Sequence, residues 1–143
     1  MLKSRVDSRT DVIVGRADGY WVSTKRQQFY NAEYYNPALY LGSGCLLSSA
    51  NDLAKWDLAL RNGTIFPDTK SDPYSGRTFD TAWGKSEDEL GRSVWTGGGL
   101  YGYTSSLIRF IDRDLTVIVL TNSADGKADI MARDVLRDGI FPV

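Results

Sequence analysis

Residues 94–106 read Val94-Trp95-Thr96-Gly97-Gly98-Gly99-Leu100-Tyr101-Gly102-Tyr103-Thr104-Ser105-Ser106. This stretch ends one apolar segment, continues as a glycine-dense turn and opens a second segment of alternating character. Side chains of a strand point in turn to its two faces. One face is therefore expected to carry Tyr103, Ser105, Leu107 and Arg109, and the other Thr104, Ser106, Ile108 and Phe110.

Further strands are predicted on both sides of this stretch. Two strand-like pieces lie before the glycines, near Thr78–Trp83 and near Arg92–Thr96, with a charged turn, Glu87-Asp88-Glu89, between them. After the alternating segment, Asp112-Arg113-Asp114 is expected to turn the chain into a β-branched strand over 116–121. The continuous apolar character of that strand predicts that both of its faces are covered.

Two helices are indicated by apolar residues at helical spacing. The first is expected from Ala50 to Asn62, capped by Ser49, with Asp52 at its third position and Gly63 as its stop. The second is expected over 128–137. The aromatic-rich segment 20–42 lacks a clean period and is interpreted as an irregular packed loop, and 63–77 as a long surface connection. A short β-type run is expected at 12–14.

Together these elements predict an α+β fold, with an antiparallel sheet of three to four strands packed by helices. A chain of 143 residues is long enough for one domain, so 1–143 is interpreted as a single domain. The content of 42% hydrophobic and 24% charged residues is typical of a soluble globular protein.

Charge and composition argue against several classes of function. The net charge of -1 gives no drive toward nucleic acid or an anionic membrane. The basic residues Lys3, Arg5, Arg9 and Arg16 alternate with Asp7 and Asp11 and are interpreted as a solvated face. No signal peptide and no apolar run of membrane-spanning length is visible, so a cytoplasmic location is the default expectation.

The chain contains no histidine and a single cysteine, Cys45. Mechanisms that need a Ser-His-Asp or Cys-His pair are therefore excluded, as are histidine metal sites. Cys45 has no partner for an internal disulfide. We expect neither a metal nor a cofactor, and a nucleophile would need Lys, Tyr, Asp or Glu as its base.

Several segments, in order along the chain, resemble the C-terminal half of the serine β-lactamase and penicillin-binding-protein superfamily. This family includes class C β-lactamases, D-Ala-D-Ala carboxypeptidases and related esterases. The segments are Gly15–Tyr20 (the family's R-A-x-G-Y), Gly42–Trp56 (G-G-L-x-S-T-x-x-D-L-x-x-W), Trp83-Gly84 (G-W), Trp95–Gly98 (K-T-G or H-x-G) and Asp114–Asn122 (a strand ending L-T-N). The resemblance covers most of residues 15–137.

The resemblance implies substrate-binding roles for Trp95, Thr96, Gly97 and Gly98, and Tyr101 is predicted to bind a ligand along the same cleft wall. In such proteins the residue after the triplet, here Gly98, supplies an oxyanion-hole N–H, and Thr96 would bond a substrate carboxylate. Trp95 departs from the usual Lys or His, because its indole has one N–H donor and no positive charge. Taken without the family, these glycines are better explained by a turn that only connects two strands, because short glycine motifs are unspecific.

The motif that holds the family's nucleophile, S-x-x-K, is absent. No serine has lysine three residues later, and Ser23 has Arg26 there, which stays protonated and cannot act as a base. Tyr34-Tyr35-Asn36 fits the family's Y-x-N but follows the R-A-x-G-Y match instead of preceding it, so it is interpreted as a chance match. We therefore expect no catalytic residue in this chain.

Three functions remain open. The chain is expected to be a truncated serine-hydrolase domain that is inactive alone. Alternatively, it is a subunit of a split hydrolase completed by a partner chain, or a non-enzymatic module that binds a peptide or peptidoglycan fragment. Uncovered strand edges and apolar surface would in each case favour a homo-oligomer or a complementary chain as partner.

Overall fold

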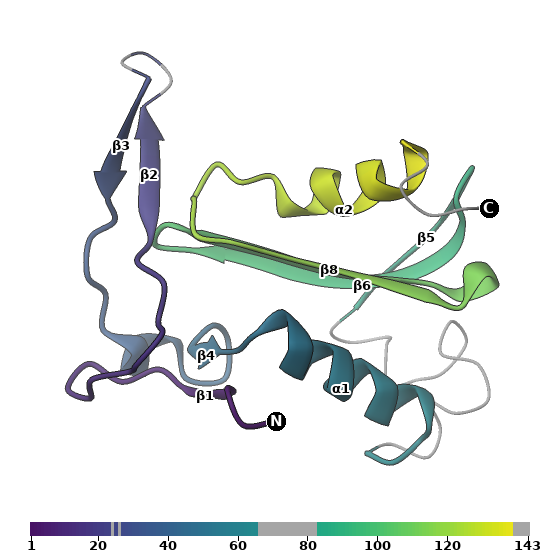
Figure 1. The fold of residues 1–143 in the computed structure, drawn as a ribbon, viewed down its shortest axis with the longest axis horizontal. Coiled ribbons are helices and arrows are strands. Elements are labelled where there is room, and N and C mark those ends of the chain that lie inside the picture. The colour runs from purple at the N-terminus through teal and green to yellow at the C-terminus, as the bar shows by residue number, and fades with distance from the viewer. Residues whose placement is uncertain (24, 26, 66–82, 139–143) are drawn as a thin grey trace.

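A computed structural model describes residues 1–23, 25, 27–65 and 83–138 of the chain. Its centre is an antiparallel sheet in the order β5-β6-β7-β8 (Figure 1). The strands are β5 (Gly84–Asp88), β6 (Gly91–Leu100), β7 (Tyr103–Phe110) and β8 (Leu115–Thr121). The prediction of an α+β fold around an antiparallel sheet of three to four strands is confirmed.

Two helices cover opposite faces of this sheet (Figure 1). Helix α1 (Ala50–Arg61) packs against β8 from one side, and α2 (Ala128–Arg137) packs against β7 and β8 from the other. The expected cover on both faces of β8 is therefore confirmed. The core under α2 contains Leu90, Ile108, Phe110, Val117 and Ala132, and the core under α1 contains Leu60 and Val94 with Trp56 and Trp83 beside them.

The helix boundaries agree with the local sequence signals. The Ser49 hydroxyl accepts the Asp52 N–H at 3.3 Å, as expected of a cap, and Gly63 follows the helix with a positive φ of 65°. Helix α2 has the bounds that the periodicity predicts. In the part of the chain that the structure describes, no helix is both long and apolar enough to cross a lipid bilayer.

The glycines of the central motif do not form the turn, so that prediction was wrong. They lie inside β6, and the turn consists of Tyr101 and Gly102, with φ of 39° and 85°. Positive φ at both central positions is typical of a type I′ turn, whose twist matches that of the flanking strands. The glycines therefore lengthen the strand, and Gly102 supplies the conformational freedom that the turn requires.

The expected charged turn was also misplaced. Glu87 and Asp88 belong to β5, and the turn is Glu89-Leu90, where the Asp88 carboxylate accepts the Leu90 N–H at 2.9 Å. The buried Leu90 side chain joins the core under α2, which places the turn later in the chain than the charge pattern suggests. Most of the predicted strand Thr78–Trp83, and the predicted connection from residue 66 onward, lie outside the described residues.

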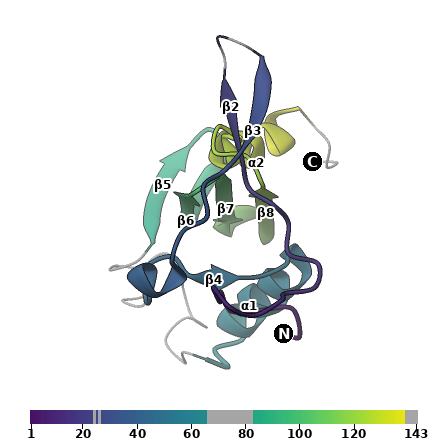
Figure 2. The ribbon, with the colours of Figure 1, turned by 90° about the vertical axis from the view of Figure 1, so that its left-hand side faces the viewer.

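The first third of the chain differs most from expectation. Segment 20–42 is not an irregular loop, because β2 (Tyr20–Ser23) and β3 (Gln28–Asn31) form a hairpin that stands out from the body (Figures 1 and 2). A 3₁₀ helix follows at Pro37–Tyr40. The aromatic and β-branched residues of β2 and β3 favour strands. Residues 12–14 form no strand, and the short strands here are β1 (Arg5–Val6) and β4 (Leu46–Leu47), which pair.

Candidate substrate-binding strand

Strand β6 has one open edge along its second half. Strand β5 pairs only with residues 91–95 of β6, whereas β7 pairs with residues 93–100. The β5–β6 and β6–β7 hairpins both have two-residue turns. The residues next to each turn, Asp88 with Gly91 and Leu100 with Tyr103, therefore exchange two backbone hydrogen bonds. Along each strand pair, hydrogen-bonded residue pairs then alternate with pairs that are not hydrogen-bonded. The backbone groups of Gly97 and Gly99 therefore point away from β7, toward an edge that no described strand covers.

The same alternation of hydrogen-bonded pairs determines where the N–H group of Gly98 points. Gly98 pairs with Ser105 as a bonded pair, so its N–H is used inside the sheet. The resemblance assigns an oxyanion-hole N–H to Gly98, but the outward donors on this strand are those of Gly97 and Gly99. The binding roles of the five candidate residues remain predictions.

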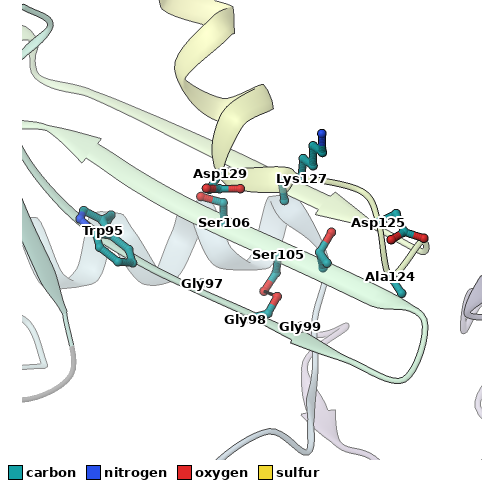
Figure 3. A pocket seen from close by; sticks show the side chains of 12 residues that line it. Trp95, Gly97, Gly98, Gly99, Ser105, Ser106, Ala124, Asp125, Lys127 and Asp129 are labelled. Carbon is teal, nitrogen blue, oxygen red and sulfur yellow. Dashed lines mark hydrogen bonds between the residues drawn. The ribbon is translucent and has the colours of Figure 1, made fainter. Parts of the chain in front are cut away.

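A hollow of about 480 Å³ lies beside this strand, on the α2 side of the sheet (Figure 3). Glycines form much of its floor, and a Cβ on Gly97 would lie 2.6 Å from the Ser105 carbonyl oxygen. Of the five candidate residues, three line the hollow, Trp95, Gly97 and Gly98, whereas Thr96 and Tyr101 do not. Its other lining residues are Gly99, Thr104, Ser105, Ser106, Ala124, Asp125, Lys127, Ala128 and Asp129.

Trp95 lines the hollow at one end, and its ring lies over the backbone of the neighbouring strand β5. It pairs with Gly84, and a Cβ on Gly84 would collide with the Trp95 ring. Trp95 as a residue is 42% exposed. Trp95 therefore covers the backbone of β5 and presents an apolar surface where the family motif has a charged residue.

Tyr101 belongs to a cluster of tyrosines at the far end of β6. Its ring stacks on Tyr35 with centroids 5.0 Å apart, and its hydroxyl accepts a hydrogen bond from Tyr40 at 3.3 Å. Asn36, beside Tyr35, accepts the Ala38 N–H at 3.2 Å and so caps the 3₁₀ helix. Tyr34, the tyrosine of the Y-x-N match, is exposed, and its hydroxyl donates to the Ser8 carbonyl at 3.3 Å.

Two of the segments that carry the resemblance, Gly15–Tyr20 and Asp114–Asn122, meet at the β6–β7 turn. The Tyr20 N–H donates to the carbonyls of Gly102 at 3.2 Å and Asn122 at 3.0 Å. The Tyr103 hydroxyl donates to the Ala17 carbonyl at 2.7 Å. The R-A-x-G-Y-like stretch and the end of β8 thus hold the turn in place, which in turn positions the open edge of β6.

A buried carboxylate stabilises this end of the molecule. The Asp7 side chain is fully buried and accepts hydrogen bonds from Arg16 Nη1 at 2.9 Å, the Tyr35 hydroxyl at 2.9 Å and the Ser8 N–H at 2.8 Å. Burial raises the pKa of the Tyr35 hydroxyl well above its usual value, and the hydrogen bond and negative charge of Asp7 raise it further. The prediction that Arg16 belongs to a solvated basic face was wrong, because Arg16 neutralises this buried charge.

The Tyr35 hydroxyl should make stability depend on alkaline pH. A tyrosine whose pKa is higher in the folded state than in the unfolded chain stabilises the fold. This contribution is fully present at pH values below the pKa of the unfolded chain, about 10, and is lost as pH rises above that value. Below that pH, the free energy of unfolding of Tyr35→Phe should be about 1.5–3 kcal/mol lower than that of wild type, because the variant lacks a hydrogen bond to a charged group. Urea unfolding at increasing pH should show the difference between wild type and variant shrinking. A constant difference would contradict this, and Tyr34→Phe, at an exposed ring, is the control.

The described residues contain no group of three or more His, Cys, Asp or Glu side chains placed to hold a metal ion. Ser106 is followed three residues later by Arg109, but both lie on β7, where this spacing puts side chains on opposite faces. This serine therefore gains no neighbouring base from that spacing.

Comparison with known proteins agrees with the resemblance. The family model described as Beta-lactamase matches residues 4–139. Penicillin-binding protein 4* of Bacillus subtilis (strain 168) is 33% identical over 94 residues, which is 59% of this chain and 21% of that protein. The aligned part thus spans about a fifth of the length of this curated relative.

Proposed function

The chain belongs to the β-lactamase family, and we propose that it forms the substrate-binding wall of a serine-hydrolase site whose nucleophile lies outside these 143 residues. The observation that carries the proposal is the edge of β6 along residues 96–100 that no described strand covers. There, the N–H groups of Gly97 and Gly99 point outward beside a glycine-lined hollow.

This edge suits the recognition of an acyl group. Backbone N–H groups held in a sheet donate to a carbonyl oxygen without having to reorganise, and they stabilise the charge that develops there during acyl transfer. Because glycines have no side chains, a substrate can approach the backbone closely. The exposed Trp95 adds an apolar contact at one end of the edge.

The chemistry itself needs groups that this sequence does not contain. In the family motif, serine and lysine are separated by one helical turn, so that lysine can take the serine proton. No serine here has lysine at that spacing. The chain alone is therefore expected not to hydrolyse β-lactams or esters, and the nucleophile is expected to come from a longer form of the protein or from a partner chain.

Uncovered surface supports completion by further protein. Strand β8 is an end strand of the described sheet, and such edges attract additional strands. Large apolar side chains are also more than half exposed in the first 47 residues, and patches of this kind usually mark contacts with other protein. They are Leu2, Val6, Val12, Val14, Phe29, Tyr34, Leu39, Leu41 and Leu46.

The test is an assay with a chromogenic β-lactam and a p-nitrophenyl ester. The purified chain should give no turnover above buffer. Mixing it with a separately expressed family fragment that carries S-x-x-K should restore turnover, which a serine-to-alanine change in that fragment should abolish. Saturable binding without turnover in any mixture would instead favour a binding module. Turnover by the chain alone would overturn the proposal.

A further inference from the structure

The β2–β3 hairpin exposes aromatic side chains on both of its faces. Trp21 lies opposite Tyr30, and Val22 lies opposite Phe29, so the two pairs occupy opposite faces. Trp21 is 44% exposed, Phe29 70% and Tyr30 40%. A two-stranded hairpin in water is marginally stable by itself, and exposed Trp, Tyr and Phe side chains are typical of protein interfaces.

The hairpin also differs in charge from the rest of the chain. Residues 19–32 contain Lys25 and Arg26 and no acidic residue, although the chain as a whole carries a net charge of -1. The remainder of the molecule is therefore acidic. A basic, aromatic arm on an acidic body is charge-complementary to another copy of the same body.

The glycine-lined hollow has the matching properties. Its glycine floor and the small side chains of Ala124 and Ala128 leave room for an aromatic ring, and about 480 Å³ falls within the ~300–1,000 Å³ of pockets that bind such groups. Asp125 and Asp129 provide negative charge at its rim. Lys127 is also part of the rim, but its side chain extends away from Gly97–Gly99 (Figure 3).

Hairpin and hollow lie next to each other in one molecule, which permits a reciprocal contact. The Val22 N–H donates to the Asp125 carboxylate at 3.2 Å, and the Ala124 N–H donates to the Tyr20 carbonyl at 2.9 Å. A twofold axis near the contact between Val22 and Asp125 would bring the hairpin of each copy to the hollow of the other copy, which gives a closed dimer.

We propose that the chain forms a dimer in which the β2–β3 hairpin of each copy places Phe29 in the glycine-lined hollow of the other, with Lys25 near Asp129. This contact covers the most exposed aromatic side chain of the hairpin. It also brings the basic tip of the hairpin to the acidic rim. The dimer contact fills the hollow beside the proposed substrate-binding edge, so Phe29 and a substrate would compete for this hollow. The contact itself requires no hydrolase activity.

Sedimentation equilibrium over a range of concentrations tests this proposal. Wild type should approach twice the 15.9 kDa of the chain. Phe29→Ser, Lys25→Glu and Asp129→Lys should each raise the dimer dissociation constant by roughly tenfold or more. The double variant Lys25→Glu/Asp129→Lys should recover most of the affinity, because it restores opposite charges. Arg9→Glu makes the same charge change at an exposed site elsewhere and should have no effect.

Circular dichroism should show that every variant remains folded. A wild type that stays monomeric at all concentrations would overturn the proposal, as would a dimer that is insensitive to Phe29→Ser. A monomer that binds phosphatidylglycerol vesicles, and loses that binding with Lys25→Glu, would assign the hairpin to a lipid surface instead. Failure of the charge-swapped pair to recover affinity would refute the contact between Lys25 and Asp129.

Discussion

Replacing Asp7 by asparagine is expected to lower the free energy of unfolding by about 3–5 kcal/mol, which is the usual effect of breaking a buried ion pair from one side. The Asp7 side chain is fully buried, and that of Arg16 is 19% exposed. Without the carboxylate charge, the Arg16 guanidinium keeps its desolvation cost and loses its counter-ion. The Tyr35 hydroxyl and the Ser8 N–H would also donate to a weaker acceptor.

Urea unfolding of wild type and Asp7→Asn measures this effect. Asp11→Asn is the matched control, because Asp11 pairs with Arg5 at 2.7 Å with both side chains about half exposed. Such surface pairs contribute roughly 0–1 kcal/mol. Equal effects of the two substitutions would show that burial of Asp7 does not matter, contrary to the structure.

The second large effect is expected at the β6–β7 turn. Gly102 has a φ of 85°, and a Cβ there would lie 2.6 Å from both the Tyr20 backbone nitrogen and the Ala32 Cβ. Gly102→Ala should therefore cost about 1–2 kcal/mol for its backbone conformation and about 1–3 kcal/mol more for the steric conflict. The steric conflict lies where the Tyr20 segment contacts the β6–β7 turn, and this contact positions the open edge of β6.

Gly42→Ala separates these two contributions. Gly42 has a nearly identical φ of 87°, and a Cβ there would meet nothing within 4 Å. In thermal unfolding, the melting temperature of Gly102→Ala should be well below that of Gly42→Ala. The melting temperature of Gly42→Ala should be below that of wild type only by the amount that corresponds to the conformational cost. Equal melting temperatures for the two variants would mean that the Tyr20 segment does not pack on the turn.

Local signals in the sequence were sufficient for much of the fold. Both helices and the strands β7 and β8 follow from periodicity and caps, which depend on residues close together in the chain. The turn at Tyr101-Gly102 could not be predicted in the same way, because the three preceding glycines are equally good turn formers. Only their pairing with β7 places them in a strand.

The candidate site was predictable in part. Trp95, Gly97 and Gly98 do lie together beside the hollow, as their proximity in sequence suggests. The outward direction of the Gly97 and Gly99 N–H groups depends on strand register, which no sequence pattern reveals. Nor could the sequence pair Asp7 with Arg16 and Tyr35, because the tertiary fold brings these residues together and no periodicity relates them.

If this chain holds the substrate wall of a serine hydrolase without the nucleophile, as proposed, a penicillin should not acylate it. Intact-mass spectrometry of the chain during incubation with a penicillin, with turnover followed in the same sample, is the direct test, because a serine nucleophile would either retain the opened β-lactam as an ester or hydrolyse that ester and give turnover. We expect an unchanged mass and no turnover for the chain, and an adduct only on a complementing fragment that carries S-x-x-K. An adduct on any serine of this chain would show that the chain carries its own nucleophile, contrary to the proposed function, and would identify it.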